Sequence, residues 1–235
     1  MKMLVIQTGD ATAAAKKYGN FNDWFQHAVP DKLMYSVHVH RGETLPEFSW
    51  VKDHCSHIII TGSVAMITEQ QSWMVKTQHW LANIIDDVPI LGVCFGHQLL
   101  ADLLGGEVKN NPKGRNMGLS ECELTEAGLL DPLFKFQSQK TIKTWVSHLQ
   151  AVKQLPSDAK RLAVSDMDSN HAFRYKSHVY GVQFHPEWNS NIMQAYIRDR
   201  AEVLTAEGHD TTHILQTAQV PIDGSALIRQ FINKI

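Results

Sequence analysis

Cys94 stands where the local sequence best suits a nucleophile. The run Val88–Gln98 (VPILGVCFGHQ) passes from a buried strand-like stretch into a helical one, and Cys94 lies at the change, between Gly92 and Gly96. A sharp strand-to-helix turn needs small neighbours and a constrained backbone, which these glycines supply. The N-terminus of the following helix would favour thiolate over thiol. A buried structural cysteine is the alternative, but the flanking glycines favour a nucleophile.

A second segment supplies a base for that thiol. His178–Trp188 (HVYGVQFHPEW) is an apolar strand that ends in His185, and Glu187 follows after Pro186. A carboxylate placed there can accept one imidazole N–H and leave the other ring nitrogen facing a substrate. On its own, His185 is more typical of a surface histidine, one of 13 in the chain, and Glu187 of a solvated charge. Beside Cys94, the pair predicts a Cys-His-Glu triad.

The two segments resemble a known family. Gly92-Val-Cys-Phe-Gly-His-Gln98 and Gly181-Val-Gln-Phe-His-Pro-Glu187 are similar to the two signature blocks of class I glutamine amidotransferases of the triad type, such as the glutaminase of GMP synthase, in the same order and at a similar separation. The resemblance covers about residues 1 to 190. It implies an α/β fold with an open, mostly parallel, flavodoxin-like sheet flanked by helices, in which Cys94, His185 and Glu187 are catalytic.

The resemblance implies further site residues. Ile58–Ser63 (IIITGS), a strand followed by a glycine turn, is similar to the family's oxyanion loop. The backbone of Gly62 and Ser63, with the N–H of Phe95, would then stabilise the tetrahedral oxyanion. Thr61–Ser63 is also compatible with an ordinary turn at a strand end. The substrate-binding positions implied by the helix and by the block WVSHLQ are Gln98, Ser147, His148 and Leu149.

The implied reaction is hydrolysis of a γ-glutamyl amide. Cys94 attacks the side-chain carbonyl of glutamine, His185 protonates the departing ammonia, and water then resolves a γ-glutamyl thioester. In this family the ammonia normally passes to a synthetase on the same chain or on a separate subunit. Only 48 residues run from Trp188 to Ile235. We therefore expect a free-standing enzyme, either with a separate ammonia-accepting synthetase subunit or without a partner.

Two other functions remain open at the level of sequence. A γ-glutamyl peptidase or hydrolase would use the same triad on γ-glutamyl peptides or conjugates, and Ile60–Ser63 and Phe173–Lys176 also resemble free-standing members of that kind. A non-catalytic regulatory subunit would keep the fold and lose the chemistry. The presence of all three triad residues argues against that loss.

The elements that must position these residues follow a strand–helix alternation. The first four predicted strands are separated by 17 to 29 residues, which is enough for crossover helices and typical of a parallel sheet. The last three predict an antiparallel or mixed extension. The predicted strands are Met3–Gln7, Tyr35–Val39, His57–Ile60, Ile90–Val93, Leu162–Val164, Ala172–Tyr175 and Val179–Phe184. The predicted helices are Phe21–Ala28, Ser72–Asp86, His97–Leu104, Asn191–Leu204 and Ala226–Ile235. We expect a catalytic domain over residues 1–200 and a helical appendage over 201–235 packed on it.

The amino-acid composition argues against nucleic acid and membrane surfaces as binding partners. With 22 basic and 24 acidic residues the net charge is −2, so there is no field to gather nucleic acid or an anionic membrane surface. No apolar stretch approaches the roughly 20 residues that span a bilayer. Three scattered cysteines and no signal-peptide pattern favour a reducing cytoplasm. The histidine pair His38/His40 lacks an identifiable third ligand, so we expect neither a metal nor a cofactor, and a small-molecule substrate.

Overall fold

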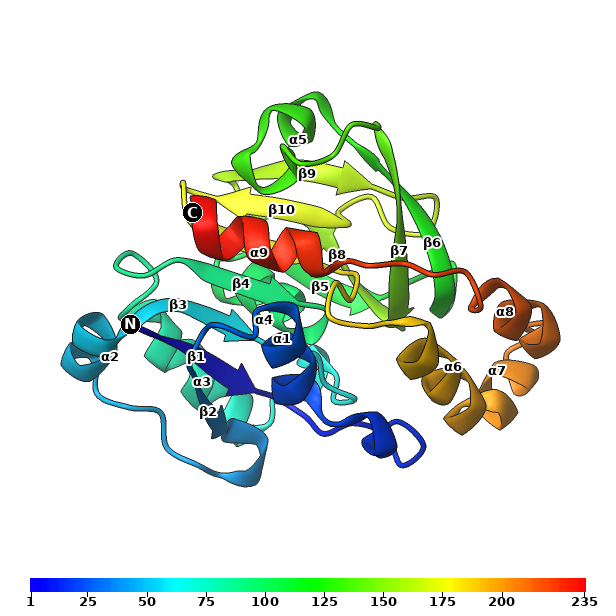
Figure 1. Cartoon of the computed structure of the whole chain (residues 1–235), viewed down its shortest axis with the longest axis horizontal. Coiled ribbons are helices and arrows are strands. Elements are labelled where there is room, and N and C mark those ends of the chain that lie inside the picture. The colour runs from blue at the N-terminus through cyan, green and yellow to red at the C-terminus, as the bar shows by residue number, and fades with distance from the viewer.

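The computed structural model describes all 235 residues, and a nine-stranded sheet forms its centre (Figure 1). The strand order is β2-β1-β3-β4-β11-β10-β9-β6-β7. The first five strands of that order run parallel, and each later pair is antiparallel. A second sheet pairs β5 with β8. The strands are β1 (Lys2–Gln7), β2 (Met34–His38), β3 (Cys55–Ile60), β4 (Ile90–Val93), β5 (Glu107–Asn110), β6 (Asn116–Leu124), β7 (Thr141–His148), β8 (Gln150–Gln154), β9 (Ala159–Val164), β10 (Ala172–Tyr175) and β11 (Val179–Val182).

Helices cover both faces of the parallel strands. Alternate residues of each strand point to opposite faces, so Ile59 packs in one cluster with residues of α1 and α9, whereas Ile58 and Ile60 pack in another with residues of α2, α3 and α4. The helices are α1 (Phe21–Ala28), α2 (Phe48–His54), α3 (Ser72–Ala82), α4 (Phe95–Leu103), α5 (Glu126–Leu130), α6 (Ser190–Asp199), α7 (Ala201–Ala206), α8 (Thr211–Thr217) and α9 (Ser225–Lys234). None is long and apolar enough to cross a bilayer.

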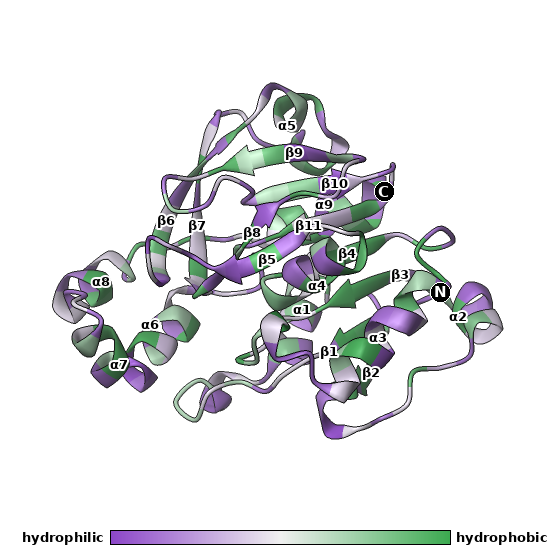
Figure 2. Ribbon diagram, turned by 180° about the vertical axis from the view of Figure 1, so that it is seen from behind, coloured by the Kyte–Doolittle hydropathy of each residue, from purple (hydrophilic) through white to green (hydrophobic).

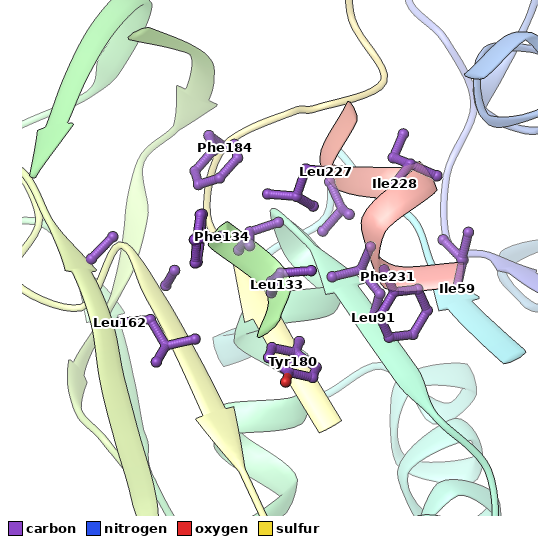
Figure 3. Close-up of a cluster of buried hydrophobic side chains, with 14 of the residues drawn as sticks. Ile59, Leu91, Leu133, Phe134, Leu162, Tyr180, Phe184, Leu227, Ile228 and Phe231 are labelled. Carbon is purple, nitrogen blue, oxygen red and sulfur yellow. The ribbon is translucent and has the colours of Figure 1, made fainter. Parts of the chain in front are cut away.

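The last helix is part of the main core. Leu227, Ile228 and Phe231 of α9 are each at most 2% exposed and pack with Ile59 and Leu91 of the central strands (Figure 3). α9 therefore closes one face of the sheet.

Helices α6, α7 and α8 form a group beside one end of β6 and β7 (Figure 1). Asn189 caps α6, because its side chain accepts hydrogen bonds from the backbone N–H groups of Asn191 and Ile192. The inner side of the group packs on an aromatic cluster that includes Trp24, Trp145 and Trp188. This cluster lies next to the predicted site.

The predicted fold class, an open and mostly parallel α/β sheet with an antiparallel extension, is confirmed. Four strands were absent from the prediction, namely β5, β6, β7 and β8. Their colours in Figure 2 are paler or more hydrophilic than those of β1, β3 and β4. Buried and exposed residues alternate at the end of β6 and at the start of β7, which shortens the apolar runs of these strands. The predicted helix Asn191–Leu204 is wrong as a single element, because the chain breaks at Arg200, where α6 ends and α7 begins.

Candidate active site

The residues of the predicted triad lie close together because two neighbouring strands end at the same edge of the sheet. β4 and β11 are parallel, with Val93 opposite Val182. Cys94 directly follows β4, and His185 lies three residues beyond the end of β11. The backbone N–H of Cys94 donates to the Val182 carbonyl at 2.8 Å. Two motifs that are 91 residues apart in the sequence are thereby placed side by side.

Cys94 has a strained backbone at a tight turn. Its φ of 53° and ψ of −100° lie in a region that side-chain-bearing residues rarely adopt. The helix that begins at Phe95 packs directly on the strands: a Cβ on Gly92 would lie 2.4 Å from the Gly96 carbonyl oxygen, and one on Gly96 would lie 2.4 Å from that of Ile60. Only glycine permits this approach. The geometry is that of a nucleophile elbow.

His185 is held between Glu187 and an aromatic ring. Its Nδ1 lies 2.8 Å from Oε1 of Glu187, and its ring stacks on Trp188 with centroids 3.7 Å apart. Burial lowers the pKa of His185, but the negative charges of Glu187 and Cys94 more than offset it and raise the pKa to about 10. This arrangement favours the imidazolium form of His185.

The residues of the predicted oxyanion loop lie around Cys94. Ser63 and Phe95 line the same cavity as Cys94. Phe95 is the first residue of α4, so its N–H has no partner within the helix. Gly62 lies against the base, because a Cβ there would be 2.9 Å from Cε1 of His185. The structure thus brings all three positions to the triad.

Two cavities meet at Cys94. The first, here called the Gln98 pocket, extends from Cys94 past Gln98 and His148. The second, here called the Trp188 pocket, is walled by His185 and Trp188. They share Ser63, Val64, Cys94, Ser147 and Arg200.

The predicted substrate-binding residues line the Gln98 pocket. Gln98 is only 4% exposed and is fixed by its side-chain nitrogen, which donates to the Gln150 carbonyl at 2.8 Å and to Oε1 of Gln183 at 2.9 Å. Ser147 lies over the nucleophile, with its carbonyl oxygen 3.7 Å from Sγ of Cys94. The other two predicted substrate-binding residues, His148 and Leu149, also line this pocket.

Comparison with known proteins fixes the family. The model of the glutamine amidotransferase class-I family matches residues 18–203. The chain belongs to this family. The match spans most of the chain and includes Cys94, His185 and Glu187.

Relatives of this amidotransferase chain include γ-glutamyl peptidases and GMP synthase subunits. γ-Glutamyl peptidase 4 of Arabidopsis thaliana is 28% identical over 99% of this chain and 92% of its own length. One subunit of the glutamine-hydrolysing GMP synthase of Archaeoglobus fulgidus is 45% identical, over 43% of this chain and 53% of its own length. A glutamine amidotransferase structure from Thermotoga maritima superposes with a TM-score of 0.76 at 20% identity, covering 99% of this chain and 97% of that one, and shows the same fold. Family and relatives identify the chain as an enzyme of hydrolase type, as predicted.

Several residues of this amidotransferase site were not found from the sequence. Arg200 lines both pockets, and Arg115 lines the Gln98 pocket. The rings of Phe21 and Tyr196 join Trp188 in the wall of the second pocket. None of them belongs to a signature block, and an arginine at the end of a helix gives no pattern that marks it as functional.

The histidine pair His38/His40 lies beside Asp10, with one possible ligand atom from each residue within 4.8 Å of the others. Asp10 is already paired with Arg41 at 2.7 Å, and both ring nitrogens of His40 have partners, in Gln7 and Asp10. The positive charge of Arg41 on the Asp10 carboxylate disfavours a metal cation at this position.

Proposed function

We propose that this chain hydrolyses γ-glutamyl amides through a thioester on Cys94, with His185 as acid and base and Glu187 orienting it. The observation that carries this proposal is the convergence of a strained Cys94 with the buried His185–Glu187 pair at one mouth shared by two cavities. A strained nucleophile with an oriented base beside it is what covalent acyl transfer requires.

The proposed steps use groups already in place. The Cys94 thiolate adds to the γ-carbonyl carbon, and the resulting oxyanion takes hydrogen bonds from backbone N–H groups of Phe95 and the Gly62–Ser63 turn. The His185 imidazolium then gives its proton to the departing nitrogen as the C–N bond breaks. Neutral His185 next takes a proton from water, which attacks the thioester carbonyl and releases glutamate.

Glutamine is the substrate expected from the family. Its glutamyl part would occupy the Gln98 pocket, bound by Gln98 and by the segment Ser147–Leu149, and ammonia would leave. In that case a separate synthetase subunit would accept the ammonia, and the similarity to the GMP synthase subunit supports this possibility.

A second candidate is a γ-glutamyl peptidase, whose leaving group is an amino acid or peptide amine. The similarity to γ-glutamyl peptidase 4 spans 99% of this chain, whereas the similarity to the GMP synthase subunit spans 43%. The Trp188 pocket also presents the rings of Phe21, Trp188 and Tyr196 on the side of His185, which suits a leaving group larger than ammonia.

The test is a substrate panel on the purified chain. Glutamine, γ-glutamyl dipeptides and a glutathione-type S-conjugate would be compared by glutamate release, and labelling by a diazo-ketone glutamine analogue would be mapped by peptide mass spectrometry. We expect turnover of at least one substrate, labelling at Cys94, and neither in Cys94→Ala. A folded protein with no labelling and no turnover would refute both enzymatic functions and leave the regulatory one.

A further inference from the structure

Arg200 is a charged group at the centre of the site with no partner. It follows the last residue of α6 and lines both pockets. Its side chain makes no ion pair and no hydrogen bond, and its Nε is buried without an acceptor. The neighbouring Arg115 differs, because its Nε and a terminal nitrogen bind the Glu207 carboxylate at 2.8 and 3.0 Å. Of the two guanidinium groups in the cavity, only that of Arg200 forms no ion pair, although the carboxylates of Asp199 and Glu207 lie near enough to interact with its charge.

An unpaired guanidinium in a partly buried site is costly. Burial and the positive charge of Arg115 lower the pKa of Arg200, against smaller opposing effects of Tyr196, Cys94 and Asp199, but an arginine remains protonated in proteins. A desolvated charge is stable when an opposite charge accepts its hydrogen bonds. No protein carboxylate does so for Arg200, since Glu207 is taken by Arg115. A carboxylate on the substrate fits this position, and a planar guanidinium can bind it in bidentate fashion.

The position of the acid separates the two halves of the substrate. His185 lines the Trp188 pocket and not the Gln98 pocket. Because His185 must reach the departing nitrogen, the leaving group belongs in the Trp188 pocket and the glutamyl part in the Gln98 pocket. The leaving side is walled by the rings of Phe21, Trp188 and Tyr196. Ammonia needs neither these rings nor a cation.

We propose that Arg200 binds the carboxylate of the leaving group, so that the preferred substrates are γ-glutamyl amino acids or peptides with a free C-terminal carboxylate. This inference rests on the thioester chemistry proposed above for Cys94. Arg200 is then a specificity-determining residue that acts on the amine half of the substrate.

Matched substrates test it. Initial rates would be measured for γ-glutamylalanine, γ-glutamylalanine amide and glutamine, with wild type, Arg200→Gln and Arg200→Lys. Arg198→Gln is the control, because Arg198 is exposed on the same helix, bonds only Gln194 and lines neither pocket. Thermal unfolding and Cys94 labelling would be recorded for each protein. The Arg200 side chain holds no other part of the fold, so we expect unchanged unfolding midpoints.

The expected result is selective. Wild type should prefer the free carboxylate to the amide, and Arg200→Gln should lose about 10- to 100-fold in kcat/KM on γ-glutamylalanine, the size expected for a charged hydrogen-bonded pair. The kcat/KM of Arg200→Gln on γ-glutamylalanine amide and on glutamine should change by less than about threefold, which is less than the loss of one charged hydrogen-bonded pair would cause. Lysine should restore part of the loss.

Two results would overturn the inference. An equal loss on all three substrates would show that Arg200 binds the glutamyl carboxylate that they share. If wild type showed no preference for the free carboxylate, Arg200 would not bind the leaving group. Either result would leave the thioester chemistry intact. Absence of turnover and of Cys94 labelling in wild type would instead refute the proposed function itself, and this inference with it.

Discussion

Replacing Glu187 with glutamine removes one negative charge while keeping the shape of the site. Glu187 is 7% exposed, and its Oε1 accepts from Nδ1 of His185 at 2.8 Å, while its Oε2 has no partner. If the glutamine oxygen faces His185, the hydrogen bond survives without its charge and the amide NH₂ is buried without an acceptor. If the NH₂ faces His185, the imidazole must adopt the other tautomer.

The magnitude follows from the charged hydrogen bond. Hydrogen bonds to charged groups contribute about 1.5–3 kcal/mol, and about 1.4 kcal/mol is a factor of ten in rate. We expect kcat of Glu187→Gln to fall about 10- to 100-fold. The negative charge of Glu187 also helps raise the pKa of His185, so the alkaline limb of the rate profile should move to lower pH.

The assay is glutamate release from the best substrate of the panel, measured from pH 6 to 11, with Glu202→Gln as the control. Glu202 is an exposed acid in α7 that makes no ion pair. A loss of less than about twofold in Glu187→Gln, with the alkaline limb unmoved, would show that another group orients His185.

Four further outcomes are expected. Cys94→Ser should abolish turnover and leave the unfolding midpoint unchanged, as measured by glutamate release and thermal melts. Gly96→Ala should destabilise the fold by about 1–3 kcal/mol in urea unfolding, because its Cβ would meet the Ile60 carbonyl oxygen at 2.4 Å. Turnover should fall above about pH 10 as His185 loses its proton. Because the pKa of His185 is raised from 6.5, its contribution to stability is complete below pH 6.5 and is lost as the pH rises to about 10. Denaturant melts across that range would detect this loss. Phe231→Ala should cost about 3–5 kcal/mol in the same unfolding assay.

The parallel half of the sheet could be predicted because it is buried on both faces. Strands such as His57–Ile60 and Ile90–Val93 are short continuous apolar runs, which is what such burial demands. Strand β6 (Asn116–Leu124) has an exposed Glu121 beside a buried Cys122, and only its alternation signals a strand. The break between α6 and α7 gives no signal either, because the helical spacing continues across Arg200.

The candidate site likewise contains residues that the sequence could single out and residues that it could not. Cys94 and His185 could be found because chemistry restricts the residues around them: glycines at the elbow, and a carboxylate two positions from the base. Arg200 and Tyr196 have no such neighbours in sequence. Their role depends on where α6 ends relative to the sheet, which is a tertiary property that no local pattern encodes.

The reactive residues and the pocket residues come from different elements, and this separation affects how substrate choice can change in such a fold. The proposed triad comes from the ends of β4 and β11, whose register also holds the core together. Most of the aromatic wall of the Trp188 pocket and its one unpaired cation come from α1 and from the region around α6, outside both signature motifs. A substitution at Arg200 therefore touches neither the strand register nor the elbow. On the chemistry proposed above, the amine half of the substrate could therefore change while the thioester steps stay the same.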